Sequence, residues 1–115
     1  MNAGIAINTK RGLMRRATTP THTFTFPEDV PVNELSDILV TYSQCKSKIL
    51  EKKLADMVLS VEDNTASLTL SQDETTRFAP GKALIQVRAK GNNNVVLASQ
   101  MIWLDVKPVL DSKEM

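Results

Sequence analysis

Cysteine, histidine and aromatic residues are scarce in this 115-residue chain, which has one Cys, one His, three Phe, one Tyr and one Trp. A single cysteine, Cys45, excludes an intrachain disulfide and is typical of a reducing cytoplasm. Cys45 could be a nucleophile, but only one histidine is available to activate it. A tolerated small residue at a strand end is therefore the favoured interpretation.

Long apolar runs are also absent, and none approaches the length that crosses a bilayer. Residues 1–8 lack the basic-then-apolar order of a signal peptide. We therefore expect no membrane partner and no export by the general secretory route.

Residue types that carry catalytic chemistry are few and scattered. His22 could be a general base or a metal ligand, but no Cys/His pair stands at ligand spacing, and a structural histidine beside Phe24 is favoured. Paired carboxylates occur only in expected turns, where they are usually solvated: Glu28-Asp29, Glu62-Asp63 and Asp73-Glu74. No glycine-rich phosphate loop or nucleophile elbow is present. The chain is predicted to be no enzyme, with no metal, no cofactor and no small-molecule substrate.

Charge is balanced overall but unevenly distributed. The first 27 residues contain four cations and no acid, whereas the remainder holds ten basic and thirteen acidic side chains. The cations belong to an expected flexible arm over residues 1–17: Lys10, Arg11, Arg15 and Arg16. Such an arm could contact nucleic acid, dock on an acidic partner or remain solvated. The cations have no aromatic residues interleaved among them, so they are a weak signal of nucleic-acid binding. Within the same arm, Ile5 and Ile7 could add a strand to the edge of a neighbouring sheet.

Period-two alternation dominates the rest of the chain and predicts seven strands. They are expected over residues 21–26, 37–44, 47–54, 57–61, 66–70, 82–90 and 95–106. Short polar turns join neighbouring runs into three hairpins: Cys45-Lys46-Ser47, Glu62-Asp63-Asn64 and Gly91-Asn92-Asn93-Asn94. For residues 47–54 the charged string Glu51-Lys52-Lys53 leaves a helix open, while as a strand its lysines suit a sheet edge.

One helical turn interrupts the strands. Ser71 and Glu74 fit a capping box, and Pro80 and Gly81 end the helical pattern soon afterwards. A short helical turn between two sheets is common in immunoglobulin-like sandwiches. The predicted fold class is all-β, an immunoglobulin-like antiparallel β-sandwich of about seven strands over residues 18–107, followed by a polar tail over residues 108–115. Strand order stays open, although the tight turn after Gln44 favours same-sheet pairing there.

Strand parity separates an interior from an outer apolar set. Inward positions include Val40, Val87 and Leu104, whereas Leu39, Met101 and Trp103 fall on faces that the core does not use. Exposed Trp and Met are enriched at the centres of protein interfaces. We therefore predict an interface at these three residues. The alternatives are that the arm or tail covers them, or that a β-bulge reverses the parity.

Residues 15–26, Arg-Arg-Ala-Thr-Thr-Pro-Thr-His-Thr-Phe-Thr-Phe, resemble the opening of a group of small prophage-encoded proteins from Gram-positive gut bacteria. Ala17 stands where those proteins have glycine. The similarity extends over roughly residues 15–107, through residues 40–44, 68–75 and 85–88, whereas residues 1–14 lengthen the usual start and could be a docking arm. Members are similar to the N-terminal immunoglobulin-like domain of phage baseplate upper proteins.

This resemblance implies a structural module of a virion, tail or baseplate, and brings no catalytic residues with it. It implies partners that are further copies of the chain or other phage structural proteins, and a location in the host cytoplasm during assembly and then in the virion. The alternative is a nucleic-acid or regulatory binding module that uses the basic arm, which would show salt-dependent binding. A carbohydrate-binding module with Trp103 stacked on sugar is a third possibility, disfavoured by the low aromatic content.

Overall fold

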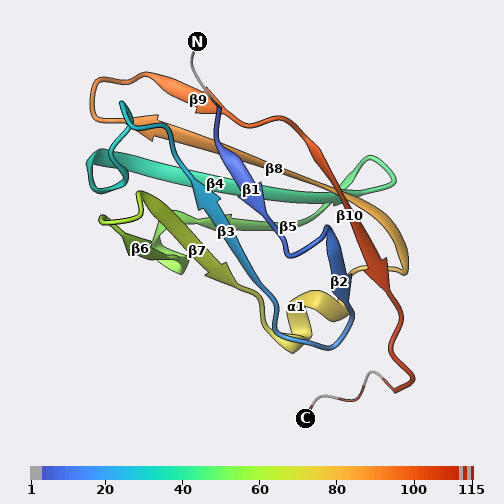
Figure 1. The fold of residues 1–115 in the computed structure, drawn as a ribbon. Coiled ribbons are helices and arrows are strands. Elements are labelled where there is room, and N and C mark those ends of the chain that lie inside the picture. Colours follow the sequence, from blue (N-terminus) through green and yellow to red (C-terminus); the bar gives the residue numbers. More distant parts are fainter. Residues whose placement is uncertain (1–3, 112, 114) are drawn as a thin grey trace.

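Two β-sheets pack face to face in the computed structural model, which describes residues 4–111, 113 and 115. The described residues form ten strands, one α-helix and two 3-10 helices (Figure 1). The all-β sandwich predicted by the alternation is confirmed. Among the described residues, none of the helices combines the length and apolar character that a membrane crossing requires.

The first sheet, sheet A, has four antiparallel strands in the order β1 (Ala6–Asn8), β3 (Thr21–Thr25), β7 (Thr65–Thr69) and β6 (Val58–Ser60). Its inner face contributes Phe24 and Leu68 to the core. Its outer face carries hydroxyl side chains that bond across the strands, with Thr21 Oγ1 2.8 Å from Thr69 Oγ1. The outer face of sheet A is therefore largely polar and internally hydrogen-bonded.

The second sheet, sheet B, has a continuous path of five strands. Their order is β2 (Leu13–Arg15), β10 (Ile102–Lys107), β8 (Gly81–Gly91), β4 (Leu35–Gln44) and β5 (Ser47–Lys53). A sixth strand, β9 (Val96–Ala98), pairs with the far part of β8. All pairs are antiparallel except β2 with β10, which is parallel.

This strand order is that of an immunoglobulin domain. Sheet A reproduces the A-B-E-D order, and β10-β8-β4-β5 reproduces G-F-C with an added C′ strand. The β4–β5 hairpin is therefore the C–C′ hairpin, which explains its same-sheet pairing. The helical turn, α1 (Gln72–Thr76), lies between the E and F strands, as the capping box predicts. Ser71 Oγ accepts from Glu74 N at 3.1 Å, and Ser71 N donates to Glu74 Oε1 at 2.9 Å.

The prediction of a flexible N-terminal arm is wrong for residues 4–17. They form β1 on sheet A and β2 on sheet B, so this segment crosses from one sheet to the other. Ile5 and Met14 are buried in the core, with 7% and 1% of their surface exposed. Single inward side chains separated by a turn leave little periodicity to detect, which is why the sequence favoured a flexible segment. Residues 1–3 of the predicted arm lie outside the described residues.

The strand count differs from the predicted seven because of this segment and a bulge. The seven expected runs all contain strands, β1 and β2 add two, and the run over residues 95–106 divides into β9 and β10. At the division the side chain of Ser99 enters the ladder: Val87 N donates to Ser99 Oγ at 2.9 Å, and Ser99 Oγ donates to Gln100 O at 2.9 Å. The bulge lies before Ile102, so the inward orientation predicted for Leu104 is correct, and Val106 on the same face is buried as well.

Short segments complete the chain. A 3-10 helix, η1 (Val32–Glu34), leads into β4, and a second, η2 (Leu54–Asp56), follows β5. The predicted run over residues 47–54, for which the sequence left a helix open, is thus mainly the strand β5. In the predicted tail, Leu110 is fully exposed, and residues 112 and 114 lie outside the described part of the chain.

Candidate functional site

An exposed apolar patch lies on the outer face of sheet B, along β10 and the edge strand β2. Met101 and Trp103 are 63% and 62% exposed, and Leu13 is 43% exposed. Leu84, half-buried on β8, pairs directly with Trp103. The outward orientation predicted for Met101 and Trp103 is confirmed, whereas their role in an interface stays a prediction. Leu13 and Leu84 were not among the predicted interface residues.

The third predicted interface residue, Leu39, lies elsewhere on the same face. Leu39 pairs with Arg88 on β8, four residues along the strand from Leu84. Leu39 therefore lies about 13 Å from Trp103 along the strand direction and two strands away from it across the sheet. Leu39 is half-buried and lines a shallow groove of about 180 Å³ with Asp37, Lys90 and Val96. The structure therefore unites Met101 and Trp103 but separates Leu39 from them.

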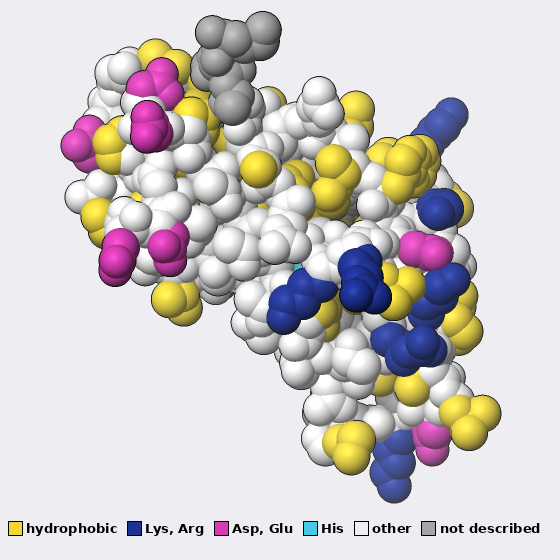
Figure 2. Space-filling view, in the orientation of Figure 1, with side chains coloured by type: hydrophobic (Ala, Val, Ile, Leu, Met, Phe, Trp, Pro, Cys, Tyr) yellow, Lys and Arg dark blue, Asp and Glu magenta, His cyan; other side chains and the backbone are white. Residues whose placement is uncertain are grey.

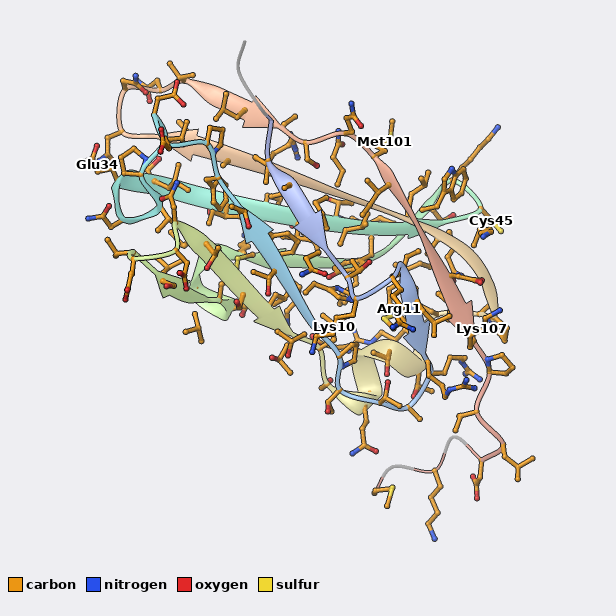
Figure 3. All side chains as sticks on the ribbon, in the orientation of Figure 1. Lys10, Arg11, Glu34, Cys45, Met101 and Lys107 are labelled. Carbon is orange, nitrogen blue, oxygen red and sulfur yellow. The ribbon has the colours of Figure 1, made fainter. Side chains whose placement is uncertain are left out.

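The chain turns from sheet A to sheet B between β1 and β2, and two of the predicted basic residues, Lys10 and Arg11, lie in this turn. Lys10, Arg11 and Gly12 all have left-handed backbone angles, with φ of 56°, 75° and 67°. The Gly12 carbonyl accepts from Asp105 N at 2.7 Å, and a side chain at Gly12 would begin 3.6 Å from the Trp103 carbonyl oxygen. The backbone that carries Arg11 is therefore held beside the backbone of β10 at Trp103. Figure 3 labels Lys10 and Arg11 beside β2, and Lys107 at the end of β10.

The other two predicted basic residues have structural contacts. Arg15 Nη1 donates to the Pro108 carbonyl at 2.7 Å and ties β2 to the segment after β10. Arg16 is half-buried, and its Nη2 donates to the Thr76 carbonyl at 3.0 Å, where α1 ends. Arg16 therefore stabilises the fold, whereas Lys10 and Arg11 remain available to a partner.

Basic side chains outnumber acidic ones in β2, in the turn before it and at the end of β10, where Lys10, Arg11, Arg15 and Lys107 stand against Asp105. Figure 2 shows Lys and Arg side chains gathered on the side of the molecule where β2 and the end of β10 lie, and most Asp and Glu side chains gathered at the opposite end. One carboxylate, Asp105, lies within the patch and pairs with Lys107 at 3.1 Å; the hydrogen bond from Lys107 lowers the pKa of Asp105. No ion pair among the described residues involves Lys10, Arg11 or Arg15. We name Leu13, Met101, Trp103, Lys10 and Arg11 the basic-aromatic surface.

The one histidine is part of the core, as predicted. His22 is fully buried, and its Nδ1 lies 2.7 Å from the Tyr42 hydroxyl oxygen. Burial lowers the pKa of His22 from 6.5 to about 4, so the ring is neutral at physiological pH. Tyr42 packs edge-on against Phe78, with ring centroids 5.8 Å apart. A neutral imidazole enclosed by the two sheets cannot reach a dissolved substrate.

Other side chains with potential chemistry remain dispersed. Cys45 is exposed in the β4–β5 turn, where its φ is 50°. Within residues 4–111, 113 and 115, no cluster of His, Cys, Asp and Glu could hold a metal ion. No model of a known protein family matches this chain, and no curated protein sequence matches it either.

Proposed function

We propose that this protein is a non-enzymatic structural module that works by assembling with further copies of itself or with other proteins. The observation that carries the proposal is the basic-aromatic surface, where Trp103 stands exposed on β10 and the turn that carries Lys10 and Arg11 runs alongside that strand. Tryptophan and arginine are the residues most enriched at the energetic centres of interfaces. The exposure of a large apolar side chain to water is unfavourable, so a partner that covers Trp103 gains free energy of binding.

The biological setting we propose is a phage virion, tail or baseplate, with assembly in the host cytoplasm. Its support is the resemblance of residues 15–26 to small prophage proteins, together with the immunoglobulin-like strand order. Mass spectrometry of purified virions from the parent phage tests this setting. Virions that lack the protein would contradict it.

Replacing Trp103 with glutamate tests the assembly surface. Trp103→Glu is expected to leave the circular dichroism spectrum and the melting temperature unchanged, because the side chain is 62% exposed. It should abolish assembly in light scattering, because a carboxylate then stands at the centre of the contact. The matched control is Val58→Glu, at a position 75% exposed on sheet A, which should assemble normally. Normal assembly of Trp103→Glu would contradict the proposal.

A second candidate function is binding of single-stranded nucleic acid. It is favoured by Lys10 and Arg11 beside Trp103, since cations that track a backbone and an aromatic platform for bases are the usual combination. A mobility shift that weakens with salt and disappears in the Lys10→Gln/Arg11→Gln variant would support it. Absence of a shift at low salt would eliminate it.

A further inference from the structure

The end of the sandwich away from the basic cluster is acidic. Five carboxylates lie there in the loop before β4 and in the β6–β7 turn: Glu28, Asp29, Glu34, Glu62 and Asp63. All are exposed, and none forms an ion pair with another described residue. Figure 2 shows these acidic side chains grouped at one end, and Figure 3 labels Glu34 there.

This acidic end is rigidly built. The loop and the turn are joined by Asn64, whose amide nitrogen donates to the carbonyls of Phe26 and Pro27, both at 3.0 Å. Its amide oxygen accepts from Val32 N at 2.7 Å. The carboxylates are thus presented by a fixed surface and not by a loose loop.

A groove of about 450 Å³ opens between this loop and the β8–β9 turn. Its apolar lining comes from Val30, Leu35 and Leu97, and its carboxylates are Asp29 and Glu34. The groove has the size of small-ligand pockets, so a single aromatic side chain fits within it. Its chemistry is the counterpart of the basic-aromatic surface, apolar at the centre and opposite in charge at the rim.

We propose that the occupant of this groove is a second copy of the chain, which inserts Trp103 and sets Lys10 and Arg11 against Asp29 and Glu34. The inference rests on the proposed assembly function and names its partner and geometry. Because the two contacting surfaces differ, the contact is head-to-tail, and repetition produces a ring or an open chain.

Charge decides between this contact and a symmetric one. Two basic-aromatic surfaces placed face to face would bring Lys10 and Arg11 of both copies into one interface, where like charges repel. The acidic groove removes that repulsion and buries the same tryptophan. Head-to-tail association should therefore weaken when salt screens the opposite charges.

Two charge-reversed variants test the proposal. The variant Lys10→Glu/Arg11→Glu has two acidic surfaces, and Asp29→Lys/Glu34→Lys has two basic ones. Each alone is expected to stay monomeric in sedimentation velocity, while an equimolar mixture should assemble as the wild type does. Trp103 is the only tryptophan, so its emission should shift to shorter wavelength in the wild type and in the mixture only. Circular dichroism and melting curves verify that each variant is folded.

Each other result overturns the head-to-tail contact. If Asp29→Lys/Glu34→Lys assembles normally while Trp103→Glu does not, the groove is not the partner, but the proposed assembly function survives. If the mixture of reversed variants stays monomeric, opposite charge is not the basis of association. If the wild type is monomeric at every concentration, the second copy is excluded, whereas Trp103-dependent capture of another virion protein would still support the assembly function.

Discussion

His22 has one ring nitrogen bonded to Tyr42 and a second, Nε2, with no hydrogen-bond partner among the described residues. Protonation would place a charge and a new donor in an apolar interior, which is why burial lowers the pKa. The unfolded chain takes up this proton near pH 6.5, whereas the folded chain resists it until about pH 4. Stability is therefore complete above pH 6.5 and falls as the pH decreases toward 4.

The expected loss of unfolding free energy between pH 7 and pH 5 is about 2 kcal/mol from this one residue. Urea unfolding at pH 7 and pH 5 measures this loss of unfolding free energy. Both pH values lie above the range in which ordinary carboxylates titrate, so His22 dominates the difference. The double variant His22→Phe/Tyr42→Phe removes both polar groups and should lose this pH dependence. His22→Phe alone strands the Tyr42 hydroxyl and should be less stable than the double variant by about 1–3 kcal/mol. Equal pH dependence in the wild type and the double variant would contradict this role of His22.

Asn64 combines a left-handed backbone, with φ of 57°, and an amide that bonds four backbone groups of the preceding loop. Asn64→Gly retains the backbone preference but loses the amide, so it should reduce the unfolding free energy by about 2–4 kcal/mol. Asn64→Ala should cost about 1 kcal/mol more, because alanine disfavours that φ. Asn94 is a matched control, with φ of 66°. It is exposed, and no side-chain hydrogen bond joins it to another described residue. Asn94→Gly is therefore expected to be nearly neutral in the same denaturation experiment.

At the scale of elements, Ser99 controls the division of the last strand. Val87 N donates a buried hydrogen bond to the Ser99 hydroxyl oxygen at 2.9 Å, where a regular strand would supply a backbone carbonyl. Ser99→Ala leaves that N–H without a partner and should cost about 1–3 kcal/mol of unfolding free energy. Ser36→Ala is the control, since the exposed Ser36 hydroxyl donates to the Lys90 carbonyl at 3.1 Å. Its loss should change stability by less than about 0.5 kcal/mol. Equal effects of the two substitutions would show that the bulge is not held by Ser99.

Elements that depend on neighbouring residues could be predicted from the sequence, and those that depend on distant partners could not. The capping box at Ser71 and the alternation of β8 are complete within a few residues, so both were predictable. The bulge at Ser99 needs the backbone of Val87 on another strand. The left-handed backbone of Ala17, with φ of 60°, is likewise unusual for alanine and could not be predicted from the residue type.

At the scale of the molecule, parity placed Trp103 correctly but could not show what lies beside it. The turn that carries Lys10 and Arg11 reaches β10 because β2 pairs in parallel with that strand, and the Arg15 contact with Pro108 spans 93 residues of sequence. No local pattern encodes a contact of that range. The acidic groove is formed in the same way, by loops that strand order alone brings together. The sequence can thus predict which single residues are exposed, whereas the strand order decides which of them lie together.

The N-terminal segment joins the two sheets, and adjacent residues in β2 should separate its contributions to folding and assembly. Met14 points into the core and is 1% exposed, whereas Leu13 points outward beside Trp103 and is 43% exposed. Met14→Ala should reduce the unfolding free energy by about 2–5 kcal/mol, because it leaves a cavity between the sheets. Leu13→Ala should change it by less than about 1 kcal/mol but weaken association in sedimentation velocity. Similar stability for the two variants would mean that the segment is not part of the core in solution. A Leu13→Ala protein that assembles as the wild type does would remove Leu13 from the basic-aromatic surface, because adjacent side chains on opposite faces of a strand report separately on the interior and on the partner.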